Sequence, residues 1–128
     1  MKPISILFLA LFSLFISCKK DDDKKTSKRD LLTACDWKRV AMISNGVITY
    51  TAPCEEDDRV RFWESGQYNY TVGNVLCSQF QTGQTLYWSL STDENTLTLG
   101  TSNYTFNVSS DSLTFTGNGY SFVHVAVK

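Results

Sequence analysis

From residue 59 to the C-terminus, apolar and polar side chains alternate, and this period of two leaves few folds open. Val60 and Phe62 share one face of a short run, and Tyr68, Tyr70 and Val72 share a face of the next. Such alternation is typical of strands with one buried face, whereas a helix repeats at about 3.6 residues. The later apolar positions are Leu86, Trp88, Leu90, Leu97, Leu99, Tyr104, Phe106, Val108, Leu113 and Phe115. Turn residues separate the runs at Ser65-Gly66, Asp93-Glu94-Asn95, Ser110-Asp111 and Gly117-Asn118-Gly119.

The strand count predicts an all-β, up-and-down antiparallel barrel. Adding a first strand, Trp37–Ile43, and a last run, Tyr120–Val127, gives about eight strands with short connections, and closing them removes the exposed sheet edges. In the first strand, Trp37, Ala41 and Ile43 share a face with Arg39, and a bulge would make either terminal strand regular. One short helical turn precedes the barrel, because Thr26 or Ser27 followed by Asp30 fits a capping box.

Residues 1–17 have the pattern of a bacterial signal peptide. Lys2 supplies a positive charge, and the apolar segment 4–17 follows, with Ser as its only polar residue. This segment is too short to cross roughly 30 Å of bilayer hydrocarbon as a helix, which takes about 20 residues. A charged start followed by a short apolar segment is typical of secretory signal peptides.

The end of the apolar segment, Phe15-Ile16-Ser17-Cys18, resembles the bacterial lipobox. That resemblance implies that Cys18 carries a diacylglyceryl thioether and, after cleavage, an acyl group on its new amine. Several acyl chains hold a protein on a membrane far more firmly than one. The alternative is an ordinary Cys in a secreted protein.

Residues 18–30 are expected to be a disordered tether, because almost every side chain in them is charged or polar. Their start, Cys18-Lys19-Lys20-Asp21-Asp22-Asp23, is similar to the lipoprotein export signal of Bacteroidetes-type bacteria. The similarity implies an outer-membrane lipoprotein exposed on the cell surface. A periplasm-facing anchor is the alternative.

Residues 31–128 are expected to form the single folded domain. The whole chain has 12 basic and 13 acidic residues and a formal charge of −1. A nucleic-acid-binding protein would normally show a basic excess or stripe, so no nucleic-acid partner is expected.

Several pieces of the domain resemble the bacterial lipocalin-like domain family of lipoproteins. They cover most of residues 31–128 and occur in the family's order, although Cys35 stands where the family has Gly. The resemblance implies a lipocalin-like barrel with a ligand-binding role. The matching pieces are Leu31-Leu32-Thr33-Ala34-Cys35-Asp36-Trp37-Lys38, Cys54-Glu55-Glu56-Asp57-Asp58, Ser65-Gly66-Gln67-Tyr68, Cys77, Trp88-Ser89-Leu90-Ser91 and Thr96-Leu97-Thr98-Leu99.

The same resemblance pairs Cys54 with Cys77 in a disulfide. Both residues fall in loops that flank the expected hairpin 59–72, and an exported protein meets an oxidising compartment. Cys35 is then left over, either as a small buried residue beside Trp37 or as a reactive or intermolecular thiol.

No sequence motif points to catalysis, so the chain is expected not to be an enzyme. The nucleophile elbow, the P-loop and the dinucleotide fingerprint do not occur in the sequence. The acidic run 55–58 lacks the ligand spacing of a calcium loop and is interpreted as a solvated loop. His124 is the only His, so no metal site and no cofactor are expected.

Aromatic residues on the inward faces are the candidate ligand-binding residues. We predict a surface-anchored carrier of a small amphipathic molecule. The alternative is a protein–protein interaction module, an inhibitor or accessory subunit, with a packed barrel, no cavity and an apolar loop surface at 72–85. The candidates are Tyr68, Tyr70, Trp88, Tyr104, Phe106 and Tyr120.

Overall fold

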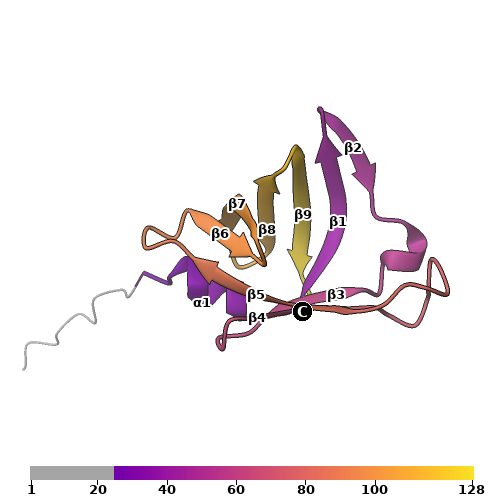
Figure 1. Ribbon diagram of the computed structural model, residues 1–128, viewed down its shortest axis with the longest axis horizontal. Coiled ribbons are helices and arrows are strands. Elements are labelled where there is room, and N and C mark those ends of the chain that lie inside the picture. Colours follow the sequence, from indigo (N-terminus) through magenta and orange to yellow (C-terminus); the bar gives the residue numbers. More distant parts are fainter. Residues whose placement is uncertain (1–24) are drawn as a thin grey trace, which may run out of the picture.

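The computed structural model describes residues 25–128, so the predicted signal peptide, Cys18 and the start of the predicted tether lie outside the described residues (Figure 1). Within this range the chain forms one nine-stranded antiparallel sheet with very little helix. The elements are α1 (Lys28–Thr33), β1 (Trp37–Ser44), β2 (Val47–Tyr50), the 3-10 turn η1 (Pro53–Glu55), β3 (Arg59–Phe62), β4 (Gln67–Thr71), β5 (Gln84–Leu90), β6 (Thr96–Leu99), β7 (Ser102–Val108), β8 (Ser112–Gly117) and β9 (Tyr120–Ala126).

Eight of the strands close into an antiparallel barrel, which confirms the predicted fold class. Strands β3 to β9 pair in chain order, and β9 returns to pair with β1 along the whole of Trp37–Ser44. The ring is completed where Trp37 of β1 pairs with Val60 of β3. Closure leaves the eight strands without a long free edge, as expected for an up-and-down barrel.

Strand β2 is additional to the predicted set. It pairs with β1 at Ala41–Ser44, beyond the point where β3 leaves β1. The hairpin turns at Asn45-Gly46, where both residues have positive φ, 51° and 77°. This turn chemistry is a strong hairpin signal that the alternation pattern did not reveal, because every residue of β2 is exposed.

The predicted bulge lies in β1. The register shifts between Arg39, which pairs with His124, and Ala41, which pairs with Val123. Beyond the shift, Met42 pairs with Phe122. Because directly paired residues share a face of the sheet, Met42 rather than Ala41 lies on the face of Arg39. The face assigned to Ala41 and Ile43 was therefore wrong, since one extra residue reverses the alternation.

Helix α1 begins as the capping pattern predicted. The Ser27 hydroxyl accepts from the Asp30 N–H, and the Asp30 carboxylate accepts from the Ser27 N–H. The helix starts at Lys28, before the predicted domain boundary at residue 31. The Lys28 N–H donates to Glu94 Oε2 at 2.8 Å, so residues 28–30 belong to the folded structure rather than to the tether.

Helix α1 covers one end of the barrel, here called the closed end (Figure 1). Leu32 and Trp37 are fully buried there, and the Trp37 indole N–H donates to the Leu32 carbonyl at 2.9 Å. Phe62 lies edge-on to Trp88 with ring centroids 5.6 Å apart. The packed core therefore fills the closed end and leaves the opposite end for a site.

Candidate functional site

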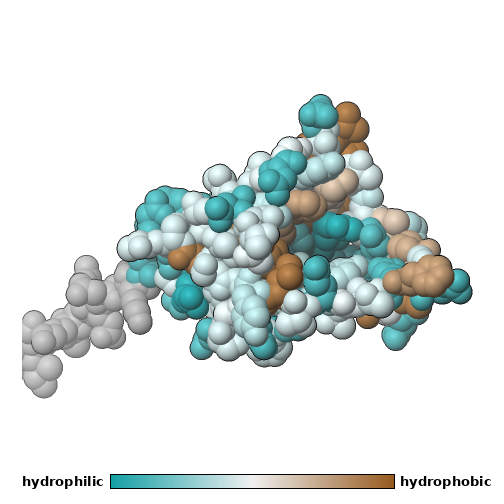
Figure 2. Space-filling model, in the orientation of Figure 1, coloured by the Kyte–Doolittle hydropathy of each residue, from teal (hydrophilic) through white to brown (hydrophobic). Residues whose placement is uncertain are grey.

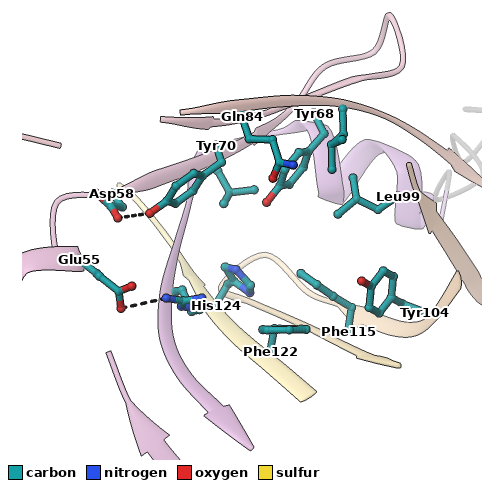
Figure 3. A pocket seen from close by; sticks show the side chains of 13 residues that line it. Glu55, Asp58, Tyr68, Tyr70, Gln84, Leu99, Tyr104, Phe115, Phe122 and His124 are labelled. Atoms are coloured by element: carbon teal, nitrogen blue, oxygen red, sulfur yellow. Dashed lines mark hydrogen bonds and ion pairs between the residues drawn. The ribbon is translucent and has the colours of Figure 1, made fainter. Parts of the chain in front are cut away.

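The barrel holds a cavity of about 210 Å³ at the end away from α1, here called the mouth. Figure 2 shows the surface hollowed between the β1–β2 hairpin and the loops below it. Figure 3 shows the lining side chains pointing into the space between two walls of strands. The lining residues are Arg39, Glu55, Asp58, Val60, Tyr68, Tyr70, Gln84, Leu86, Leu99, Tyr104, Phe115, Phe122 and His124.

The wall formed by β7, β8 and β9 is largely aromatic. Tyr104 and Phe115 meet edge-on with centroids 5.3 Å apart, and Phe115 lies 5.2 Å from Phe122. The imidazole of His124 is stacked on Phe115 at 5.1 Å, with the ring planes 18° apart. Since paired strands direct neighbouring residues to one face, these rings form a continuous apolar surface inside the barrel.

The mouth is held by the buried carboxylate of Asp58. It accepts hydrogen bonds from the Tyr70 hydroxyl, from the Gly73 N–H at 2.8 Å and from Gln81 Nε2 at 3.0 Å. Burial, and then the bond to Asp58, raises the pKa of the Tyr70 phenol. The network ties the start of β3 to β4 and to the loop of residues 72–83.

The neighbouring carboxylate of Asp57 holds the same loop. It accepts from the N–H groups of Asn74 at 2.6 Å and Val75 at 3.2 Å. A Cβ at Gly73 would collide with the Asp57 carboxylate, so this close approach requires glycine. The interpretation of run 55–58 as a solvated loop was thus wrong for Asp57 and Asp58, since tertiary contacts supply their donors.

The predicted disulfide between Cys54 and Cys77 is confirmed. It joins η1 to the loop of residues 72–83, and the bridged residues are 23 apart in the sequence. Together with Asp57 and Asp58 it fastens that loop beside the mouth. Cys35 is the free cysteine of the described residues and is half-buried. Burial raises the pKa of its thiol, opposed by the nearby charge of Arg61.

A charged pair lies at the rim of the cavity. Arg39 Nη2 and Glu55 Oε2 are 2.9 Å apart, and both side chains are about one-third exposed (Figure 3). Arg39 lies two residues after the buried Trp37 and pairs with His124, so it shares their inward face, and Glu55 comes from η1 beside the disulfide. The pair neutralises the cation that faces the cavity.

His124 is the least expected member of the site. Its side chain lines the cavity although the residue is only 3% exposed, and Nδ1 has no hydrogen-bond partner among residues 25–128. Burial, and then the charge of Arg39, lowers the pKa of His124 to about 4. The imidazole is therefore neutral at physiological pH and carries one donor and one acceptor nitrogen.

Tyr68 faces His124 from the opposite wall (Figure 3). The residue is 8% exposed, and burial raises the pKa of its phenol to about 12. Its ring packs edge-on against Phe62 at 5.1 Å. The cavity thus has a neutral phenol on one wall and a neutral imidazole on the other.

Three of the six candidate ligand-binding residues line the cavity, namely Tyr68, Tyr70 and Tyr104. The other three do not. Trp88 donates its indole N–H to the Trp63 carbonyl at 3.0 Å and packs in the closed end. Phe106 packs there as well, beneath Lys28 of α1, and Tyr120 is 42% exposed at the start of β9. Strand alternation gave the correct face for Trp88 and Phe106 but not their depth in the barrel.

The sequence reasoning missed several lining residues. His124 and Phe122 are two apart on β9, and Gln84 lies at the start of β5. Their spacing carries a usable signal, because Phe122 and His124 share a face in any regular strand. For Arg39 the signal is the face it shares with Trp37, two residues before it.

The described residues offer few other sites. Within residues 25–128, no group of three or more His, Cys, Asp and Glu side chains is placed to hold a metal ion. In the same part of the chain, no helix has both the length and the apolar character that a bilayer span requires.

Comparisons with known proteins identify the fold and nothing finer. No family model and no curated protein matches the sequence. The structure is similar to the crystal structure of an uncharacterized protein from Bacteroides eggerthii DSM 20697, with a TM-score of 0.51 and 11% sequence identity. The match covers 73% of this chain and 98% of that chain. At this identity the similarity supports a shared barrel architecture alone.

Proposed function

We propose that the chain is a cell-surface lipoprotein of the lipocalin-like family, anchored through Cys18, whose barrel binds a small amphipathic molecule. The observation that carries the proposal is the open cavity, with an apolar wall of Phe115 and Phe122 and a polar rim of Arg39 and Glu55. Apolar walls with a few convergent polar groups are characteristic of small-molecule sites.

The volume of the cavity limits the size of the ligand that it can hold. A cavity of about 150 Å³ accepts benzene, and pockets for drug-sized molecules occupy roughly 300–1,000 Å³. At about 210 Å³ the barrel has room for one substituted ring and not for a long acyl chain. This supports a compact ligand rather than a fatty acid.

The position of α1 supports an orientation for the anchored protein. The described chain enters the barrel through Ser27 at the closed end (Figure 1), and the cavity opens at the opposite end (Figure 2). Residues 18–27 span at most roughly 30 Å when extended. If Cys18 carries the lipid, the closed end faces the membrane and the mouth faces away from it.

Binding rather than catalysis is the role that the lining side chains support. The cavity of the described barrel is lined by no Ser, Cys or Lys that would serve as a nucleophile beside His124. The carboxylates of Asp58 and Glu55 are already engaged, one by three donors and the other by Arg39.

The test is native mass spectrometry of the full chain extracted gently from its own membrane. We expect a fraction with the added mass of one small molecule. Leu99→Trp places an indole in the cavity and should remove that fraction, whereas the control Val125→Trp on the outer face of β9 should retain it. Equal ligand occupancy in both variants, or no ligand in the native protein, would contradict the proposal.

Anchoring is tested separately by Cys18→Ala. Without the thiol no thioether forms, so we expect the domain to leave the membrane fraction. The control Cys35→Ala retains Cys18 and should stay membrane-bound. Continued partition of Cys18→Ala with outer membranes after a salt wash would exclude the lipobox interpretation.

A second candidate function is protein docking at the mouth, which rests on exposed apolar side chains. In the loop of residues 72–83, Val75, Leu76 and Phe80 are 55%, 51% and 81% exposed. Figure 2 shows apolar surface on both sides of the hollow, at β2 and at this loop. Apolar groups gathered on a rim are typical of interaction sites.

A photo-crosslinking residue at position 80, in cells, tests this candidate. A discrete adduct that disappears with Leu76→Asp would support docking. The control position 87 carries a tyrosine on the barrel wall that is 71% exposed, and it should give no adduct. Identical labelling at both positions would contradict it.

A further inference from the structure

Two polar side chains, His124 and Tyr68, meet at the cavity from opposite walls. The imidazole of His124 lines the cavity from β9, and the residue is 3% exposed. The Tyr68 hydroxyl forms no hydrogen bond with another group of residues 25–128, and it points into the same space from β4 (Figure 3). A hydrogen bond made where water is largely excluded adds affinity, so a ligand that pairs with both side chains gains affinity there.

The charges around the cavity select against a charged ligand. Arg39 is paired with Glu55, and Asp58 accepts three hydrogen bonds from neutral donors, so the three groups sum to one negative charge. An anion finds no free cation, because the imidazole of His124 is neutral. An ammonium group would lose its water against the aromatic wall, and both carboxylates of the cavity already hold other donors.

The shape of the far wall selects for a ring. Phe115 and Phe122 lie 5.2 Å apart with an interplanar angle of 36°, and Leu99 faces them across the cavity (Figure 3). A flat apolar ring fits between these surfaces and makes the offset contacts that aromatic groups prefer. The cavity has room for one such ring with a short substituent.

We propose that the ligand is an uncharged, single-ring phenol, with its ring on Phe115 and Phe122 and its hydroxyl bonded to the imidazole of His124. A hydroxyl both donates and accepts, so it fits either imidazole tautomer and leaves a second bond for Tyr68. This inference rests on the proposed function, because it names the ligand class of the same cavity.

The test is a fluorine NMR titration of the full chain in detergent at neutral pH. The probes are 4-fluorophenol, fluorobenzene, which lacks the hydroxyl, and the ions 4-fluorobenzoate and 4-fluorobenzylammonium. We expect 4-fluorophenol to bind about tenfold more tightly than each of the others, the difference that one hydrogen bond to a buried group provides. Leu99→Trp corrects for probe that partitions into micelles.

The variant His124→Phe keeps a ring on Phe115 and removes the imidazole. It should lose the preference for 4-fluorophenol, while the affinity for fluorobenzene stays within about threefold. Tyr68→Phe provides the same comparison from the other wall, should His124→Phe not fold. The control Tyr120→Phe removes a hydroxyl outside the cavity and should change nothing.

The outcomes separate the two proposals. If 4-fluorophenol binds no better than fluorobenzene, or if both cavity variants retain the preference, the phenol assignment is overturned and ligand binding stands. If the anion or the ammonium binds best, the charge argument is overturned. If no probe binds the native protein more than it binds Leu99→Trp, both the phenol assignment and the binding function fail.

Discussion

Acid should lower the free energy of unfolding of this protein because it protonates His124, which is buried as a neutral imidazole. The perturbation is a shift from about pH 7.5 to about pH 4.5, applied to the native chain and to His124→Phe. Burial, and then the charge of Arg39, lowers the pKa of His124 from 6.5 to about 4. Between these two pKa values the imidazole binds a proton in the unfolded chain but not in the folded chain. The free energy of unfolding therefore falls as the pH is lowered.

The magnitude follows from the two pKa values. Between the unfolded value of 6.5 and about pH 4.5, each pH unit costs about 1.4 kcal/mol while the folded imidazole stays mostly neutral. The native chain should therefore lose about 2.5 kcal/mol more than His124→Phe over this range. In a domain of this size, that loss lowers the melting temperature by roughly 10–20 °C.

Urea unfolding followed by tryptophan fluorescence at both pH values measures the difference. The carboxylates titrate in both proteins, so comparing the two pH-dependent losses isolates His124. Equal losses in the native chain and in His124→Phe would refute the burial of a neutral imidazole. A larger loss in the variant would refute the sign of the argument.

Three further predictions concern the mouth and the free thiol. Cys54→Ser combined with Cys77→Ser should lower the free energy of unfolding by about 3 kcal/mol, from the entropy of the opened loop, whereas Cys35→Ser should change it by less than about 1 kcal/mol; equal urea midpoints would contradict this. Asp58→Ala should cost about 2–3 kcal/mol and accelerate hydrogen exchange at the Gly73 amide, and unchanged exchange would show that the carboxylate does not hold the loop. Because burial raises the pKa of the Cys35 thiol, its alkylation at neutral pH should be slow until the chain is unfolded, and rapid labelling of the folded protein would contradict that environment.

The barrel was predictable because its inner face is buried along most strands. Val60, Phe62 and Tyr68 alternate with polar residues since each must point into one closed interior, and that requirement is local. The cap at Ser27 was predictable for the same reason, because its partner Asp30 lies one turn away. Strand β2 was not predicted, because all its side chains are exposed and its sequence therefore shows no alternation of apolar and polar residues.

The cavity was only partly predictable, because depth along the barrel is a tertiary property. Tyr68 and Trp88 lie on inward faces of neighbouring strands, yet one reaches the cavity and the other packs in the closed end. Arg39 shares the inward face of Trp37, yet Trp37 packs in the closed end while Arg39 lies at the rim of the cavity. Asp58 stands in an acidic run that looked solvated, and its donors come from residues up to 23 positions away.

The central claim is that the barrel keeps an accessible cavity with His124 at its wall, and a crystal structure of the protein with 4-fluorophenol tests it most directly. The account predicts density for one ring between Leu99 and Phe115, with the hydroxyl within hydrogen-bond distance of the His124 imidazole. A barrel in which Tyr70 or Phe122 has turned inward to fill the space, with no ring bound, would contradict it.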